Sequence, residues 1–266
     1  MLKSNSDTPR DHIIIPDMQV KEGFDINIAT AVGNYIAHHR PEVIVNLGDF
    51  ADMTSCSFYD YGKASFVGEN YNKDVAIVRQ MQDALFAPIH AEQERFKSEY
   101  KLKRWQPLKV MVLGNHEERI NRVLDGDHRL KGLLSMEDLG YEEFYDHVSP
   151  FLEPVIIDGV MYVHYGFDKM PNKPVAGVNQ ARTLLTKYMC SITVGHTPEF
   201  HYAEMYRANE EKIQCVVAGA CFNHHEAYAG QRNNRYWRGI IHKKEVSEGV
   251  YDFEKISLHR LLRDYS

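Results

Sequence analysis

Apolar residues occur along the chain in short unbroken runs, and each run ends at a glycine, a proline or a polar residue. Three such runs lie in the first half: HIIIPD at 12–17, EVIVNLGD at 42–49 and LKVMVLGN at 108–115. Residues 25–39, between the first two, carry apolar side chains at near-helical spacing, and this pattern stops before Pro41. Strands that are apolar at every position are buried on both faces, so these strands and helices predict a layered α/β architecture.

A long excursion separates the second run from the third. Residues 54–71 are rich in aromatic residues and predict a loop, and residues 72–99 predict an amphipathic helix that bends near Pro88. We expect residues 54–100 to form a loop-plus-helix insertion over the functional site.

The second half of the chain favours hairpins. Residues 154–166 form two apolar runs around Asp158-Gly159, a dipeptide typical of tight β-turns. The remaining expected elements are a helix at 178–189, a strand at 191–196, a hairpin of 200–207 with 212–219, and an edge strand at 249–258. Together these elements predict an α/β fold of the α-β-β-α sandwich type, with two stacked mixed sheets flanked by helices. We expect a single domain over residues 1–266, with residues 1–11 as a flexible tail.

Composition and charge narrow the class of protein. The 266 residues are 44% hydrophobic and 26% charged, which suits a folded domain, and the net charge of −6 does not attract nucleic acid or anionic membranes as a whole. Four cysteines without CxxC spacing indicate a reducing compartment. The polar start lacks the apolar core of a signal peptide, and no apolar run is long enough to cross a bilayer. We therefore predict a cytoplasmic protein with no membrane partner.

Polar residues that carry carboxylate, amide or imidazole groups follow five of the predicted strands. Any one of them, taken alone, is more often a turn former, a helix cap or a hydrogen-bonded histidine than a metal ligand. Layered α/β folds, however, place their sites at the carboxyl ends of strands, so the recurrence of carboxylate, amide and imidazole groups there indicates a metal site. The residues in question are Asp17, Gln19, Asp49, Asp52, Asn115, His116, His164 and His196.

The order and wording of these residues resemble the calcineurin-like metallophosphoesterase superfamily. Its pattern is D-x-H, GD-x-x-D, GNH[ED], a histidine after a strand, and GH-x-H or GHTP. The match runs from Asp17 to Pro198, and the GD-x-x-D, GNHE and GHTP pieces are specific. The sequence as a whole resembles phage-encoded members of this superfamily, which work in the host cytoplasm. The resemblance implies a β-sandwich flanked by helices, in agreement with the strand pattern.

The resemblance also implies a role for each residue. Asp49 would bridge two divalent metal ions. Asp17 and Gln19 would complete the protein ligands of the first metal, and Asn115, His164 and His196 would join Asp49 on the second. His116 would protonate the leaving-group oxygen, with Asp52 orienting its imidazole, and Glu117 would be structural. Apart from the resemblance, Arg119 lies three residues beyond His116, on the same face of a helix that starts there, so we expect the substrate phosphate to contact Asn115 and Arg119.

Two departures from the superfamily pattern concern the metals. Pro198 stands where many members have a second histidine, but the phosphatase-like branches also have GHTP. Gln19 stands where the superfamily has histidine, and this leaves the first site rich in oxygen ligands. Because imidazole suits Zn²⁺ and Fe better than an amide oxygen does, we expect Mn²⁺ as the cofactor, with Fe, Zn²⁺, Mg²⁺ and Ni²⁺ as alternatives.

Three functions remain open at this stage. The first is metal-dependent hydrolysis of phosphate esters, mono or di, with a nucleotide, phosphoprotein or nucleic acid as substrate. The second is a nuclease, favoured by the aromatic loop and by basic stretches at 101–105 and 231–238. The third is a non-catalytic scaffold, which only Gln19 favours.

The role of Arg119 has two interpretations: it contacts a phosphate oxygen, or it forms a surface salt bridge with Glu142 or Glu143. His224 and His225 are interpreted as pocket or surface residues.

Overall fold

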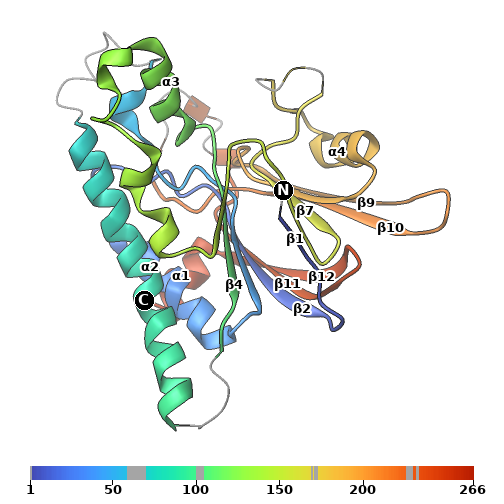
Figure 1. The fold of residues 1–266 in the computed structure, drawn as a ribbon. Coiled ribbons are helices and arrows are strands. Elements are labelled where there is room, and N and C mark those ends of the chain that lie inside the picture. The colour runs from blue at the N-terminus through green and yellow to red at the C-terminus, as the bar shows by residue number, and fades with distance from the viewer. Residues whose placement is uncertain are drawn as a thin grey trace.

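Two six-stranded sheets face each other, and helices cover the outer side of each (Figure 1). The computed structural model describes residues 2–58, 70–99, 105–168, 170, 173–225, 230–231 and 234–266. The strand order is β12-β11-β2-β3-β4-β5 in one sheet, called sheet B here, and β1-β6-β7-β8-β10-β9 in the other, called sheet A. Each sheet contains parallel and antiparallel pairs, so the predicted sandwich of two mixed sheets is confirmed.

Sheet B is built around the three apolar runs of the first half of the chain. Its strands are β2 (Arg10–Ile15), β3 (Val43–Asn46), β4 (Leu108–Val112), β5 (His147–Ser149), β11 (Gly239–Ser247) and β12 (Val250–Ser257). Strands β2 to β5 run parallel. Val43 and Val45 point into the core between the sheets, whereas Ile44 packs beneath the helices. All of β3 is therefore buried, which explains its lack of polar alternation.

Sheet A contains the predicted hairpins. Its strands are β1 (Lys3–Ser4), β6 (Val155–Ile157), β7 (Val160–Val163), β8 (Ser191–Val194), β9 (Phe200–Tyr206) and β10 (Lys212–Ala218). The turn between β6 and β7 has positive φ at both Asp158 (48°) and Gly159 (80°), the backbone that a two-residue type I′ turn requires. The hairpins β6–β7 and β9–β10 are confirmed.

Helices cover the two outer faces. They are α1 (Ile26–His39), α2 (Tyr71–Glu99), α3 (Glu118–Gly126), α4 (Gln180–Tyr188) and α5 (Leu258–Asp264), with short 3-10 helices at Thr54–Cys56, His128–Leu130, Met136–Leu139 and Tyr141–Glu143. Helices α1 and α2 lie side by side on sheet B, and α4 lies on sheet A (Figure 1). A Cβ at Gly33 would lie 2.2 Å from the Leu85 carbonyl oxygen, so glycine allows the two long helices to approach closely.

Several details differ from the sequence predictions. Residues 3–4 pair with β6, and the Ser6 amide donates to Asp158, so the expected flexible tail is held to sheet A. Helix α2 packs on α1 and sheet B rather than over the strand ends, and the loop residues 59–69 lie outside the described residues. Strand β11, with its mixture of buried and charged residues, was not predicted, whereas β12 is an edge strand as expected. No helix within the described residues is both long and apolar enough to span a membrane.

Candidate metal centre

The polar residues that follow the central strands lie together at one edge of the sandwich. Asp49 follows β3 and Asn115 follows β4 in sheet B, whereas His164 follows β7 and His196 follows β8 in sheet A. Parallel strands bring their carboxyl ends to the same edge, and stacking of the sheets brings the two edges together. Two sheets thus contribute to one cluster.

Asp49, His164 and His196 form the centre of this cluster. One ligand atom from each residue lies within 4.8 Å of the other two. His164 Nε2 lies 3.3 Å from Asp49 Oδ2 and 3.1 Å from the side-chain oxygen of Asn115. Four of the six predicted metal ligands therefore share one location. Their mixture of imidazole, carboxylate and amide groups is a ligand set that Mn²⁺, Fe or Zn²⁺ accepts.

The surroundings of His164 fit a metal-ligating histidine. Its Nδ1 lies 2.7 Å from the Leu47 carbonyl oxygen, which can only accept, so Nδ1 carries the proton. Nε2, on the other side of the ring, then faces the oxygens of Asp49 and Asn115, and it can bind a metal ion when that ion replaces its proton. A backbone carbonyl that fixes the tautomer in this way is typical of histidines that bind metals.

The charges at the cluster fit a cation as well. Burial alone would lower the pKa of His164, but Asp49 and Asp17 reverse this and raise it to about 9. Burial would likewise raise the pKa of Asp49, but the imidazoles of His116 and His164 hold it well below the usual range. Burial lowers the pKa of His196 to about 4, and His164 adds to this effect. A positive charge among these groups is therefore favoured, and His196 keeps a neutral ring that can act as a ligand.

Two glycines allow the strand ends to approach this closely. A Cβ at Gly114 would lie 2.2 Å from Asp49 Oδ1 and 2.3 Å from the Asp49 amide nitrogen. A Cβ at Gly195 would lie 2.6 Å from Asp17 Oδ1, the atom that accepts a hydrogen bond from the His196 amide at 2.9 Å. The glycines of the GN and GH pairs are thus needed for contact with the neighbouring aspartates.

Glu117 holds the backbone around Asp49. Its carboxylate is fully buried and accepts hydrogen bonds from the amides of Asp49, Ala51 and Gly114 at 2.9–3.0 Å and from the Tyr141 hydroxyl at 3.0 Å. Burial and the nearby Asp49 charge raise the pKa of Glu117. These four donors fix the loops after β3 and β4 relative to each other, which is the structural role expected for this residue.

Asp17 and Gln19 lie on the loop after β2, beside Asp49. The Gln19 amide donates to the Asp49 carbonyl oxygen at 2.8 Å, and Gln19 and Asp49 both have positive φ, at 46° and 49°. Asp17 is 1% exposed, and burial, together with the Asp49 charge, raises its pKa to about 7. A carboxyl group buried next to another carboxylate takes a proton unless a cation replaces it. Ligation of a first metal by these two residues stays a prediction.

His116 forms a second polar group next to the cluster. Its Nδ1 lies 2.8 Å from Asp52 Oδ1, and its Nε2 lies 3.7 Å from Asp49 Oδ2. Burial opposes protonation, but Asp49 and Asp52 together raise the pKa of His116. The predicted pairing of His116 with Asp52 is therefore present, with Nε2 turned towards the cluster.

Arg119 and Lys21 complete this group. Arg119 Nη1 donates to the Asp52 carbonyl oxygen at 2.7 Å and to Asp52 Oδ1 at 3.1 Å, and Lys21 Nζ lies 2.9 Å from Asp52 Oδ2. Of the two alternatives for Arg119, the structure thus places it at the site, and Glu143 pairs with Arg79 instead. The contact of Lys21 was not predicted, because it depends on how the loops after β2 and β3 lie side by side.

Aromatic residues missed in the sequence adjoin the histidines. The ring of Tyr165 lies 4.8 Å from that of His196 and 5.6 Å from that of Phe151. The ring of His224, interpreted as a pocket or surface residue, stacks on the ring of Phe222 with 4.3 Å between the ring centroids. This segment lies next to the first predicted metal site, because the amide of residue 221 donates to the Asp17 carbonyl oxygen. His225 is exposed.

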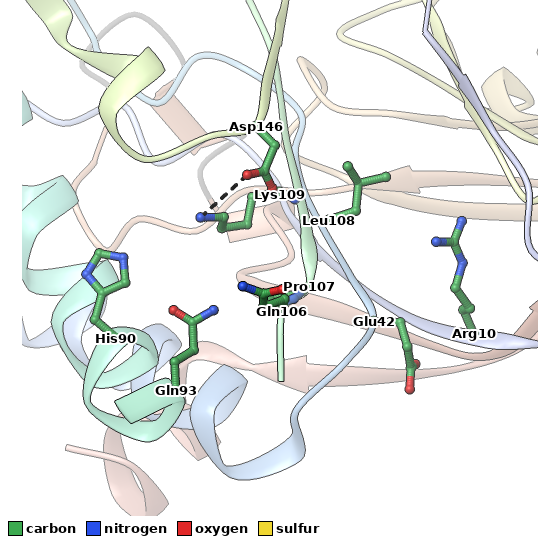
Figure 2. A pocket seen from close by; sticks show the side chains of 9 residues that line it. All are labelled: Arg10, Glu42, His90, Gln93, Gln106, Pro107, Leu108, Lys109 and Asp146. Atoms are coloured by element: carbon green, nitrogen blue, oxygen red, sulfur yellow. Dashed lines mark hydrogen bonds and ion pairs between the residues drawn. The ribbon is translucent and has the colours of Figure 1, made fainter. Parts of the chain in front are cut away.

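A separate hollow of about 720 Å³ lies at the amino end of β4 (Figure 2). Its charged groups bind within the protein: Lys109 lies 3.9 Å from Asp146, and Arg10 donates to Asp158. Because sites in layered α/β folds lie at the carboxyl ends of parallel strands, we place the functional site at the Asp49 cluster.

Comparisons with known proteins do not identify the chain. Neither a protein-family model nor a curated protein matches it. The alignment with one solved structure covers 94% of this chain and 100% of the chain in that structure, with 14% sequence identity and a TM-score of 0.36. This similarity is too low to bear on function.

Proposed function

We propose that this protein is a metal-dependent phosphoesterase that hydrolyses phosphate esters at a dinuclear centre. The observation that carries the proposal is the pairing of two groups at one sheet edge. One group is the ligand cluster of Asp49, His164 and His196, and the other is the His116–Asp52 pair, which faces that cluster. Metal ligands alone would also suit a structural site. A histidine held by a carboxylate beside them suits proton transfer.

The proposed ligands divide over two ions. Asn115, His164 and His196 would hold one cation with Asp49, and Asp17 and Gln19 would hold the other. Divalent ions bound there would activate a water molecule and neutralise the charge on the phosphoryl oxygens. The oxygen-rich set at Asp17 and Gln19 favours Mn²⁺ or Mg²⁺ over Zn²⁺.

The protein itself would orient the groups and supply a proton. Asp52 accepts from His116 Nδ1, which holds the ring so that Nε2 faces the Asp49 carboxylate. From there, Nε2 would donate a proton to the leaving-group oxygen as its bond to phosphorus breaks. Glu117, by binding three backbone amides, would keep Asp49 in place during the reaction.

The two alternative functions receive less support. The nuclease hypothesis relies on stretches of which residues 59–69, 101–104 and 232–233 lie outside the described residues. The scaffold hypothesis does not account for the His116–Asp52 pair, which a protein without catalytic function does not need.

Removal of metal tests the proposal. Protein treated with a chelator should be inactive on p-nitrophenyl phosphate and bis-p-nitrophenyl phosphate, and Mn²⁺ should restore at least one activity. A cyclic nucleotide and single-stranded DNA, run in parallel, separate the esterase from the nuclease. Equal turnover before and after chelation would remove the metal from the mechanism, and no turnover on any substrate with any of the five candidate metals would favour the scaffold.

A further inference from the structure

Arg238 is a partly buried arginine that has no carboxylate partner among the described residues. Every other partly buried arginine in the described part of the chain pairs with an aspartate or a glutamate. Burial lowers the pKa of Arg238, and no carboxylate within the described residues opposes this effect. A cation that is partly removed from water without gaining an anion is unfavourable, so its position calls for an explanation.

Aromatic rings hold the guanidinium group of Arg238 in place. Its Cζ lies 5.3 Å from the ring centroid of Tyr236 and 5.8 Å from that of Phe222. The Phe222 ring is itself stacked with the ring of His224. A ring face attracts the positive charge, but it does not replace the oxygen atoms that the N–H groups of a guanidinium bind.

The hydrogen-bond donors of Arg238 are largely unused. Within the described residues, Nε is buried without a hydrogen-bond partner, and Nη2 makes one long contact, 3.4 Å, with the His224 carbonyl oxygen. A guanidinium group has five N–H donors in a planar fork, which matches the paired oxygens of a phosphate group. The side chain is therefore positioned by the rings and equipped to bind an anion that comes from outside the protein.

The pairing of β11 with β2 places Arg238 at the edge of the sheet where the metal centre lies. β11 begins one residue after Arg238 and runs antiparallel to β2, with Ile241 opposite Ile14. The same register, continued beyond the last paired residues, puts Arg238 level with Asp17. Arg238 thus lies at the carboxyl end of β2, beside the first predicted metal site.

A short segment separates Arg238 from Asp17. Ala220 forms a bridge with Arg238, and the amide of Cys221 donates to the Asp17 carbonyl oxygen at 2.7 Å. The backbones of Arg238 and Asp17 are therefore two strand spacings apart, roughly 10 Å. In the strand order β11-β2-β3, Arg238 is on the side of Asp17 that is away from Asp49. An anion at Arg238 would lie next to the metal centre rather than on the metals.

We propose that Arg238 binds a second phosphate group of the substrate, so that the protein prefers phosphate esters that carry another phosphate near the one that is hydrolysed. The metal ligands would hold the phosphate under attack, and Arg238 would hold its neighbour. Such a neighbour is the flanking phosphate of a nucleic-acid strand or the second phosphate of a free nucleotide. This inference rests on the proposed phosphoesterase function and names its substrate class.

Two matched pairs of substrates test the inference, one for each kind of ester. The diester pair is p-nitrophenyl thymidine 5′-phosphate with and without a 3′-phosphate, which represents the flanking phosphate of a strand. The monoester pair is adenosine 3′,5′-bisphosphate and AMP, assayed for loss of the 5′-phosphate, and it represents a free nucleotide. For each pair the measurement is the ratio of kcat/KM with the second phosphate to kcat/KM without it, with Mn²⁺.

We expect the wild type to prefer the second phosphate in at least one pair, and Arg238→Gln to lower that ratio about 10- to 100-fold, the loss typical of a hydrogen bond between charged groups. Arg238→Lys keeps the charge but not the fork, so its ratio should fall less, and it carries the test if Arg238→Gln does not fold. Arg129→Gln is the control and should keep the ratio, because Arg129 is 79% exposed and pairs with Asp127.

A change of salt concentration separates binding of the second phosphate from a purely structural role of Arg238. Because salt screens partly exposed charges, the ratio should fall with ionic strength in the wild type and less so in Arg238→Gln. Circular dichroism and metal content show whether each variant is folded and loaded. A fall in the diester pair alone would assign the second phosphate to a strand, and a fall in the monoester pair alone would assign it to a nucleotide.

The results that would overturn the inference differ from those that would overturn the proposed function. Ratios that Arg238→Gln and Arg238→Lys leave unchanged in both pairs would overturn the inference alone, as would a wild type with no preference for the second phosphate in either pair. Hydrolysis of p-nitrophenyl phosphate but of none of the four paired substrates would do the same. Inactivity on all five substrates with every metal would overturn both.

Discussion

At the scale of single residues, His116 and Asp49 lie 3.7 Å apart but should behave differently when replaced. His116→Ala removes the proposed proton donor but no proposed ligand. It should therefore keep its metal content and lose about 10²- to 10⁴-fold in turnover, most for substrates with poor leaving groups.

Asp49→Asn removes the proposed bridge and should lose metal and activity together. Metal analysis with kinetics on two leaving groups checks both, and loss of metal from His116→Ala would make His116 a ligand.

At the scale of elements, the packing of the loop after β4 against the loop after β3 positions Asp49. Gly114→Ala would place a methyl group 2.2 Å from Asp49 Oδ1, so the two loops must separate. We expect the free energy of unfolding to fall by about 1–3 kcal/mol, as in other overpacked sites, and metal binding to weaken.

The matched control for this element is Gly126→Ala at the end of α3. Among the described residues, a Cβ there would meet only the Phe58 ring, at an ordinary contact distance of 3.6 Å. Stability and metal affinity should stay near the wild-type values. Denaturant unfolding and metal titration measure both variants, and wild-type behaviour of Gly114→Ala would mean that the loops are not held together as tightly as the contact implies.

At the scale of the whole molecule, a buried histidine links the two sheets and makes stability depend on pH. His12 on β2 is fully buried, with Nε2 2.9 Å from Asp158 in the β6–β7 turn and Nδ1 2.6 Å from the hydroxyl of Tyr162 on β7 of sheet A. Burial lowers its pKa from 6.5 to about 4, and Lys243 and Arg10 add to this effect, although Asp158 opposes it. The folded protein therefore keeps His12 neutral where the unfolded chain already binds a proton.

For His12 the unfolded state binds more protons than the folded state between pH 6.5 and 4, so the contribution of His12 to stability should be complete above pH 6.5 and be lost as the pH decreases to 4. The shift corresponds to roughly 3 kcal/mol at most. His12→Gln should flatten this slope, whereas replacement of the exposed His259 by glutamine should not. Denaturant unfolding at a series of pH values is the measurement, and an unchanged slope in His12→Gln would assign the pH dependence to other groups.

The sequence alone determined the central strands, the hairpins, and the kinds of residue that follow them. Strands such as β3 are apolar at every position because both faces are covered, and Asp158-Gly159 turns because both residues accept positive φ. These properties are local, so they can be read from neighbouring residues. The residues of the proposed metal centre were predicted in a similar way, since each lies within four residues of the end of a strand.

Only the tertiary structure decided which groups meet across elements. The contact of Lys21 with Asp52 needs two loops side by side, and the four donors to Glu117 come from three separate segments. The position of α2 on sheet B depends on its packing against α1, and strand β1 exists only because β6 offers it an edge. These contacts join residues far apart in the chain, and their free energy is gained only when the two sheets stack, so no local pattern of residues records them.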